Sequence, residues 1–188
     1  MSSKSFILKA LEQTAIAPQP MPEINVAPRV DDLIGQFETN LNTVAGVLHR
    51  AGSLDLVQEK VNTLVAEGKQ VISLVDGINA NRETPEDQHD LKDIDFAVIP
   101  GELAVAENGA IWVKQPEGHR VTPFICENLL LVVEADNVVA NMHQAVKKLT
   151  LDSGKFGAFI AGPSKTADIE QALVVGAHGA CSLNVYLV

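Results

Sequence analysis

Apolar and polar positions follow two different periods along this chain, and together they predict an α/β domain. Apolar residues three or four positions apart, the spacing of one helix face, predict helices at residues 4–13, 30–50, 58–67, 138–149 and 166–175. Short apolar runs predict strands at residues 70–75, 96–99, 103–106, 110–113, 129–133, 157–161 and 183–188. Because helices and strands alternate, the predicted fold class is α/β, with a mostly parallel sheet flanked by helices.

Several of these elements carry additional local signals. Asp31 or Asp32 is placed to cap the helix that begins near residue 30, and Gly52 is predicted to end it. The continuous apolar run at 129–133 is typical of a strand buried on both faces. Asn108 and Gly109 lie between two β-prone runs, and this dipeptide favours a hairpin turn. An antiparallel hairpin is therefore predicted as an insertion in the sheet.

Prolines interrupt the pattern near the N-terminus, at Pro18, Pro20, Pro22 and Pro28. Proline at this density excludes a helix interior and a central strand. The chain is therefore predicted to consist of an N-terminal helix and proline-rich arm over residues 1–30 and one domain over residues 31–188. Apolar residues share one side of the first helix, so one expectation is that it packs on a neighbouring subunit and forms a homo-oligomer through the arm.

Composition and charge narrow the classes of partner. A chain of 188 residues that is 46% hydrophobic suits one domain with a substantial core. A formal net charge of -10 excludes the dense basic face that nucleic acid or an anionic membrane surface requires. No apolar stretch has the length of a membrane span or of a signal-peptide core, so the expected location is the cytoplasm.

The cysteine count bears on metal chemistry. The chain has two cysteines, Cys126 and Cys181, which lie far apart in the sequence. An iron–sulfur cluster is held by four thiolates, and a structural zinc needs several clustered Cys or His ligands. We therefore expect no metal site and no cofactor of the chain's own, and two reduced thiols.

Two motifs relate the chain to a known family. Residues 162–179 read Gly-Pro-Ser-Lys-Thr-Ala-Asp-Ile-Glu-Gln-Ala-Leu-Val-Val-Gly-Ala-His-Gly, and residues 105–110 read Val-Ala-Glu-Asn-Gly-Ala. Both resemble motifs of the LUD-domain family, and especially of its lactate utilisation protein C group in bacteria. The resemblance covers about residues 95–188. Lys165, Ala180 and Asn108 depart from the residues that many relatives have at these positions, which puts the subgroup rather than the family in question.

The resemblance implies a fold like that of ribose-5-phosphate isomerase, glucosamine-6-phosphate deaminase and the CoA transferases. It also implies a role in oxidising L-lactate to pyruvate, as a non-redox subunit or accessory protein beside partner proteins that carry the iron–sulfur clusters. Two alternatives stand beside this hypothesis. One is a self-sufficient enzyme acting on a phosphorylated or CoA-linked substrate, and the other is a scaffold without a ligand.

The loop at residues 162–166 is the first candidate binding site. It lies between a predicted strand and a predicted helix, where backbone N–H groups and the helix dipole favour an anion such as a carboxylate or a phosphate. The ligand-binding candidates are Gly162, Ser164, Lys165, Thr166 and His178. In the alternative interpretation Ser164 or Thr166 only caps the helix. The acidic residues at 168 and 170 favour capping, because they would repel an anion.

Two residues are candidates for catalysis. His178, between Ala177 and Gly179, could donate a proton or bind an anion, or its ring could simply fix the turn through a carbonyl. Glu107, beside the Asn-Gly turn, is a candidate because a glutamate is the nucleophile in the CoA-transferase branch of the implied fold. A solvated acid at the tip of a hairpin explains Glu107 as well, and Glu102 could pair with it as acid and base.

Overall fold

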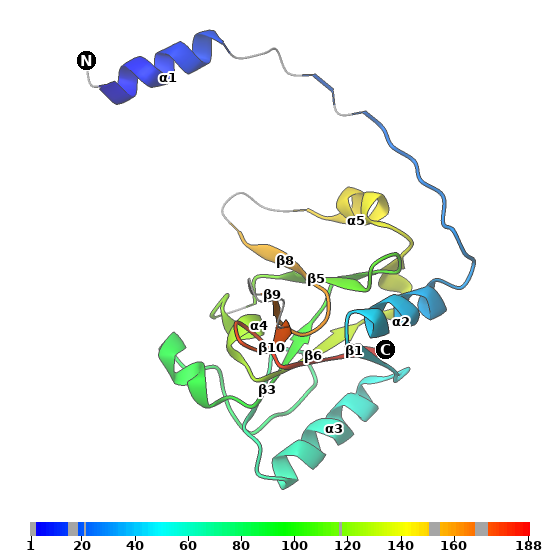
Figure 1. The fold of residues 1–188 in the computed structure, drawn as a ribbon. Coiled ribbons are helices and arrows are strands. Elements are labelled where there is room, and N and C mark those ends of the chain that lie inside the picture. Colours follow the sequence, from blue (N-terminus) through cyan, green and yellow to red (C-terminus); the bar gives the residue numbers. More distant parts are fainter. Residues whose placement is uncertain (1–2, 15–18, 21, 117, 151–154, 168–172) are drawn as a thin grey trace.

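The computed structural model describes residues 3–14, 19–20, 22–116, 118–150, 155–167 and 173–188. In this part of the chain, strands form two main sheets and one separate hairpin (Figure 1). The first sheet is parallel throughout and has the order β1-β11-β6-β3-β2. Its strands are β1 (Gly46–Arg50), β2 (Val71–Ser73), β3 (Phe96–Pro100), β6 (Asn128–Val133) and β11 (Ser182–Leu187).

The second sheet is mixed and has the order β7-β4-β5-β8. Its strands are β4 (Leu103–Val105), β5 (Ala110–Lys114), β7 (Val138–Val139) and β8 (Gly157–Ile160). The remaining strands, β9 (Lys165–Ala167) and β10 (Leu173–Val175), pair with each other. The helices are α1 (Ser3–Gln13), α2 (Leu33–Thr43), α3 (Leu54–Ala66), α4 (Thr122–Ile125) and α5 (Met142–Lys148), with 3-10 turns η1 (Gln88–Asp93) and η2 (Ala135–Asn137).

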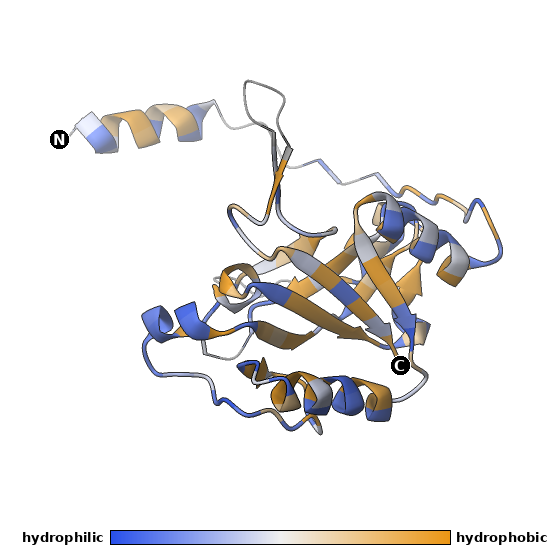
Figure 2. Ribbon diagram, turned by 60° about the horizontal axis from the view of Figure 1, so that its bottom comes forward, coloured by the Kyte–Doolittle hydropathy of each residue, from blue (hydrophilic) through white to orange (hydrophobic). Residues whose placement is uncertain are grey.

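The sheets and helices stack in layers, as Figure 1 shows: α3, the parallel sheet, the mixed sheet and then α5. Strand β6 explains this order, because its side chains alternate between the two faces of the sheet. Leu129 and Leu131 join the core between the two sheets, together with Leu41 of α2. Leu130 instead joins the core beneath α3, together with Val61. Figure 2 shows the apolar residues concentrated on these buried strands and on the inward helix faces.

The predicted α/β class and parallel sheet are confirmed, and so is the apolar strand at 129–133, which is buried along its whole length. The predicted antiparallel hairpin is also present as β4 and β5. Its loop spans residues 106–109, because β4 ends at Val105, one residue earlier than predicted. Gly109 there has φ +70, and a Cβ on it would lie 2.7 Å from the backbone of Leu41. This close approach to α2 explains why glycine is needed at the turn.

The helix predicted over residues 30–50 is correct only in its first part. Asp32 caps α2 by accepting a hydrogen bond from the Gly35 N–H at 2.8 Å, as predicted. The helix ends at Val44, because Ala45 takes a left-handed conformation with φ 66. Residues 46–50 then form β1, which pairs with β11 along its whole length. Similarly, the first residues of the helix predicted over 138–149 form strand β7, and α5 begins after the Asn141 cap.

The N-terminal helix and arm extend away from the layers (Figure 1). Helix α1 lies where it was predicted and has no buried residue. The arm is tied to α5 farther along the chain, where the Val26 carbonyl accepts from Asn141 Nδ2 at 3.1 Å and Lys147 Nζ donates to Asn25 Oδ1 at 2.6 Å. Among the described residues, no helix is long and apolar enough to cross a membrane.

Candidate functional site

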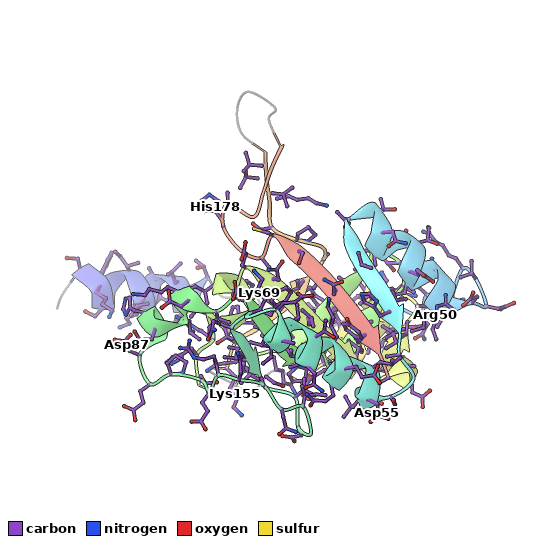
Figure 3. The ribbon with its side chains drawn as sticks, turned by 90° about the horizontal axis from the view of Figure 1, so that it is seen from below. Arg50, Asp55, Lys69, Asp87, Lys155 and His178 are labelled. Atoms are coloured by element: carbon purple, nitrogen blue, oxygen red, sulfur yellow. The ribbon has the colours of Figure 1, made fainter. Side chains whose placement is uncertain are left out.

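The motif at residues 162–179 forms the hairpin of β9 and β10 and the turn that follows it. Figure 3 shows this hairpin projecting from the body of the molecule, with His178 beside its base. The base is closed by two backbone hydrogen bonds of 2.8 Å. The Ser164 N–H donates to the Ala180 carbonyl, and the Gly176 N–H donates to the Ser164 carbonyl. The Gly-Pro-Ser-Lys-Thr end and the Gly-Ala-His-Gly end of the motif are thereby brought together.

The helix predicted over residues 166–175 is wrong in the described part of that range. Lys165 pairs with Val175, Thr166 with Val174, and Ala167 with Leu173, in antiparallel register. The β-branched side chains of Thr166, Val174 and Val175 suit a strand better than a helix. Residues 168–172 lie outside the described residues, and with them the acidic positions at 168 and 170. The predicted anion site at a helix N-terminus is therefore wrong in its helix, since a strand begins at Lys165.

Lys165 contacts the C-terminal end of α2 and not the N-terminus of a helix. Its Nζ atom donates a 2.5 Å hydrogen bond to the carbonyl of Val44, the C-cap residue of α2. A cation at a helix C-terminus is favourable, because the last carbonyl groups carry partial negative charge. Gly162 lies against the same residue with φ +75. The conformations of Gly162 and Lys165 thus fasten the hairpin to the end of α2.

Two further binding candidates, Thr166 and Ser164, contact other residues of the hairpin base. Thr166 Oγ1 donates to the Val174 carbonyl across the hairpin at 3.4 Å, which is a weak contact. Ser164 is half-buried and packs near Gly179, where an added Cβ would lie 3.2 Å from Ser164 Cβ. Ser164 thus lies beside the His178 turn, while the side chain of Lys165 is oriented by its bond to Val44.

His178 is exposed and lines a cavity of about 530 Å³. The ring forms no hydrogen bond or ion pair in the part of the chain that the structure describes, so the predicted alternative of a ring fixed by a carbonyl finds no support there. The charged residues of the cavity are Lys92, Asp93, Asp95 and Glu127. With three carboxylates and one ammonium group, the electrostatic field of this cavity opposes a small anion.

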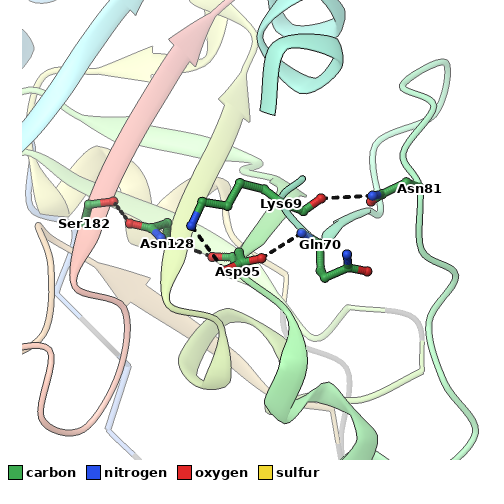
Figure 4. Close-up of polar contacts among 6 residues, drawn as sticks. All are labelled: Lys69, Gln70, Asn81, Asp95, Asn128 and Ser182. Carbon is green, nitrogen blue, oxygen red and sulfur yellow. Dashed lines mark hydrogen bonds and ion pairs between the residues drawn. The ribbon is translucent and has the colours of Figure 1, made fainter. Parts of the chain in front are cut away.

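The cavity lies at the amino ends of β3, β6 and β11, which no local sequence signal brings together. A polar network fixes these ends (Figure 4). Asp95 Oδ2 accepts from the Gln70 N–H at 2.7 Å, Lys69 Nζ lies 3.6 Å from Asp95 Oδ1, and Asn128 Nδ2 donates to the Asp95 carbonyl at 3.2 Å. Ser182 Oγ donates to Asn128 Oδ1 at 2.6 Å. These bonds link the starts of three neighbouring strands, and Asp95 is the member of the network that lines the cavity.

Two cysteines also line this cavity and differ in environment. Cys126 is buried, and burial raises the pKa of its thiol to about 12. Cys181 is exposed, and its Sγ atom lies where a Cβ on Gly176 would be, at 2.2 Å. In the described residues, no group of three or more His, Cys, Asp or Glu side chains is arranged to hold a metal ion.

Exposed apolar side chains surround the His178 turn. Phe124 and Ile125 line the cavity, and the Phe124 ring meets Phe156 edge to face with centroids 6.2 Å apart. Val174 and Val175 are each nearly half exposed on the hairpin. We call these five side chains the hairpin apolar surface. Val174 and Val175 are consecutive in β10, so they lie on opposite faces of the hairpin. Exposed apolar groups of this size are typical of a contact with another protein.

The glutamates predicted for catalysis lie elsewhere, and each has its own partner. Glu107 Oε2 accepts from the Met142 N–H at 3.2 Å, and its own N–H donates to the Ala140 carbonyl. It therefore satisfies an unpaired donor in the first turn of α5. Glu102 forms an ion pair with Lys114 at 2.6 Å. The structure does not bring Glu107 into the cavity of His178.

Comparison with known proteins identifies the family. The model of the LUD domain matches residues 79–188, which is more than half of the chain. The chain belongs to the LUD-domain family. Both motifs, at 105–110 and at 162–179, lie inside the matched region.

Curated relatives of this LUD-domain chain carry one name. Lactate utilization protein C of Bacillus pumilus is 37% identical over 91 residues, which cover 45% of this chain and 38% of that protein. The protein of the same name from Shouchella clausii is 28% identical over 105 residues, covering 53% and 46%. The aligned part thus spans less than half the length of these two relatives. Lactate utilization protein C of Deinococcus radiodurans is 24% identical over 176 residues, covering 91% of this chain and 83% of that protein.

A solved structure supports the fold of the LUD-domain chain. The crystal structure of a DUF162 family protein from Deinococcus radiodurans superposes with a TM-score of 0.63. The superposition covers 84% of this chain and 96% of that one, at 18% sequence identity. At this identity the likeness concerns the fold alone.

Proposed function

We propose that this LUD-domain protein is a non-redox subunit or accessory protein of an iron–sulfur system that oxidises L-lactate. The observation that carries the proposal is the match to several proteins named Lactate utilization protein C, together with the LUD-domain match. Two cysteines cannot supply the four thiolates of one cluster, so the electrons would pass through partner proteins that hold the clusters.

The hairpin apolar surface supports contact with such partners. Its side chains are exposed, so a partner that covers them would remove apolar surface from water. We propose that the iron–sulfur partners dock here. The acidic cavity beside it suits a basic rather than an acidic partner surface.

Binding of a small carboxylate or phosphate at the base of the hairpin is a second part of the proposal. Lys165 uses one N–H on Val44, which leaves two donors for an anion. The carboxylates near His178 oppose an anion inside that cavity, so the proposed site is at Lys165, which does not line it. A singly charged carboxylate would be repelled less than a doubly charged phosphate.

The alternative of a self-sufficient enzyme with an isomerase or CoA-transferase type of fold places different demands on the chain. It would require Glu107, Lys165 or His178 to act on a phosphorylated or CoA-linked substrate. The carboxylate of Glu107 is instead engaged at the start of α5. Turnover by the purified chain, without any partner, would favour this alternative.

Growth of the source bacterium tests the role in lactate oxidation. A strain lacking the gene should fail to grow on L-lactate as the sole carbon source and should grow normally on pyruvate, because only the oxidation step is missing. The wild-type gene should restore growth. Normal growth of the deletion strain on L-lactate would overturn the proposal.

Docking of the partners is tested by co-purification with iron–sulfur proteins of a lactate-oxidising system from the same organism. Val174→Glu places a charge on the hairpin apolar surface and should reduce the captured amount at least tenfold. Leu56→Glu is the matched control, because Leu56 on α3 is 46% exposed and Val174 is 47% exposed. Equal loss in both variants, or loss in neither, would contradict docking at the hairpin.

A further inference from the structure

A second cavity lies at the opposite, carboxyl end of the parallel strands. The end of β2 with the residues after it and the end of β3 contribute to the lining, and so do Glu102, just before β4, and the end of β5 with the residues after it. It has a volume of about 550 Å³, within the range of small-molecule sites. Ligands of open α/β sheets usually bind outside the carboxyl ends of the strands, and this cavity has that position.

The lining of this cavity combines apolar side chains with one ion pair. Leu74, Pro100 and the largely buried Ile99 form the apolar part, while Glu102 and Lys114 form the ion pair. The pair is held by the backbone of the mixed sheet, since the Glu102 N–H donates to the Trp112 carbonyl at 2.9 Å. A ligand that fits must therefore offer both an apolar part and polar groups for the pair.

The ion pair retains capacity for further hydrogen bonds. Lys114 Nζ carries three N–H donors, of which one faces Glu102 Oε1 at 2.6 Å. The second oxygen of the Glu102 carboxylate can accept a hydrogen bond. A ligand carboxylate on Lys114 and a neighbouring ligand donor on Glu102 would complete a three-membered polar network without breaking the pair.

The charge of the cavity restricts the ligand further. Asp76 is exposed at its lining, so the cavity carries two carboxylates and one ammonium group. A doubly charged phosphate is disfavoured by this balance. A single carboxylate can accept hydrogen bonds from the remaining donors of Lys114, and an ammonium group or hydroxyl beside it is favoured by Glu102 and Asp76.

We infer that this cavity binds a small monocarboxylate that carries a hydroxyl or amino group on its α carbon and an apolar tail. The carboxylate binds Lys114, the α substituent donates to Glu102, and the tail lies on Leu74, Ile99 and Pro100. The chemistry of this cavity follows from its own side chains and does not depend on the proposed role in lactate oxidation.

Four probes separate the parts of this ligand: L-leucine, 2-hydroxyisocaproate, 4-methylpentanoate and inorganic phosphate. The first two carry an α donor, the third lacks it, and the fourth lacks the tail. Titrations followed by calorimetry and by backbone amide shifts should show saturable binding of L-leucine, of 2-hydroxyisocaproate or of both, with shifts at residues 73–76, 99–102 and 114–116. 4-Methylpentanoate should bind at least tenfold more weakly.

Two variants test the ion pair. Lys114→Met should weaken the bound probe at least tenfold, and so should Glu102→Ala. Both should remain folded, because Lys114 and Glu102 are 48% and 39% exposed and such surface pairs contribute little to stability. The matched control is Glu38→Gln, which removes a charge from the exposed pair with Arg50 away from the cavity and should leave binding unchanged.

The α substituent is identified by Glu102→Gln. It should weaken L-leucine strongly and 2-hydroxyisocaproate only slightly, because an amide oxygen still accepts from a hydroxyl but no longer attracts an ammonium group. The inference is overturned if neither α-substituted acid binds, if 4-methylpentanoate binds equally well, if phosphate alone binds, or if Lys114→Met leaves the affinity unchanged.

Discussion

Gly162 is the residue in the hairpin base whose identity the backbone constrains most. Its φ is +75, and a Cβ added to it would lie 2.0 Å from the Val44 carbonyl oxygen. A side chain in the left-handed region costs about 1–2 kcal/mol by itself, and the contact with a backbone oxygen cannot be relieved by a rotamer change. We expect Gly162→Ala to lower the free energy of unfolding by about 2 kcal/mol or more, measured by urea denaturation.

Gly52 provides the matched control for this substitution. It has a similar φ of +69, but a Cβ there would meet nothing within 4 Å. Gly52→Ala should therefore show only the conformational cost of about 1 kcal/mol. If the two variants lose equal stability, Gly162 does not pack against α2 as described.

Burial of Cys126 should make the folded protein less stable at alkaline pH. Burial raises the pKa of its thiol from 9.0 to about 12, so the unfolded chain loses this proton at lower pH than the folded chain. The stabilising contribution is complete below pH 9 and is lost as the pH rises from 9 towards 12. The free energy of unfolding should fall by about 1 kcal/mol between pH 9 and pH 10 from this group alone.

Urea denaturation at pH 8, 9 and 10 checks this expectation. Burial also raises the pKa of Tyr186, so the wild type should keep losing stability above pH 10. Cys126→Ala should be less stable at pH 8, because it leaves a small cavity, but its stability should decline less between pH 9 and 10. An identical decline in the variant and the wild type would show that the thiol is not buried as a neutral group.

At the scale of the elements, the sequence predicted best what short segments determine by themselves. Strand β6 is recognisable because each of its residues at 129–133 is apolar. The β4–β5 hairpin is recognisable from Asn108 and Gly109. The turn requires the positive φ of Gly109, which glycine adopts readily. The Asp32 cap is local as well, since donor and acceptor lie three residues apart.

The elements that were mispredicted depend on distant partners. Residues 46–50 form β1 because β11, which begins at residue 182, offers a parallel edge to pair with. The spacing of Val44 and Leu48 suits a helix equally well, so no local pattern distinguishes the two. The hairpin of β9 and β10 is the exception, because its strands pair with each other and the Ser164 backbone bonds close its base within the same motif.

In the candidate site, too, features that depend on neighbouring residues were predicted and features that depend on distant residues were not. The proximity of Ser164 to the His178 turn followed from their common motif. The acidic surroundings of His178 did not, because Asp95, Glu127 and Cys181 precede three strands that only the sheet order places side by side. Nor could the contact of Lys165 with Val44 be predicted, since 121 positions separate them in the sequence.

At the scale of the whole molecule, the layers leave one element without a packing surface. Helix α1 exposes Phe6, Ile7, Leu8 and Leu11 to solvent by 50% or more. A helix of 11 residues is marginally stable alone in water, so its apolar side chains require a partner. The arm is fastened to α5 at Asn25, and α1 lies apart from the layers (Figure 1).

We expect the partner of α1 to be a second copy of the chain, because a symmetric exchange of two arms buries both helices at once. Light scattering after gel filtration should give twice the monomer mass of 20.1 kDa. The double variant Phe6→Glu and Leu8→Glu should be monomeric, because each helix would then bury two charges. Gln13→Glu, at the end of the same helix, should remain a dimer. If the wild type is monomeric while circular dichroism shows that α1 is helical, the helix does not depend on a second copy.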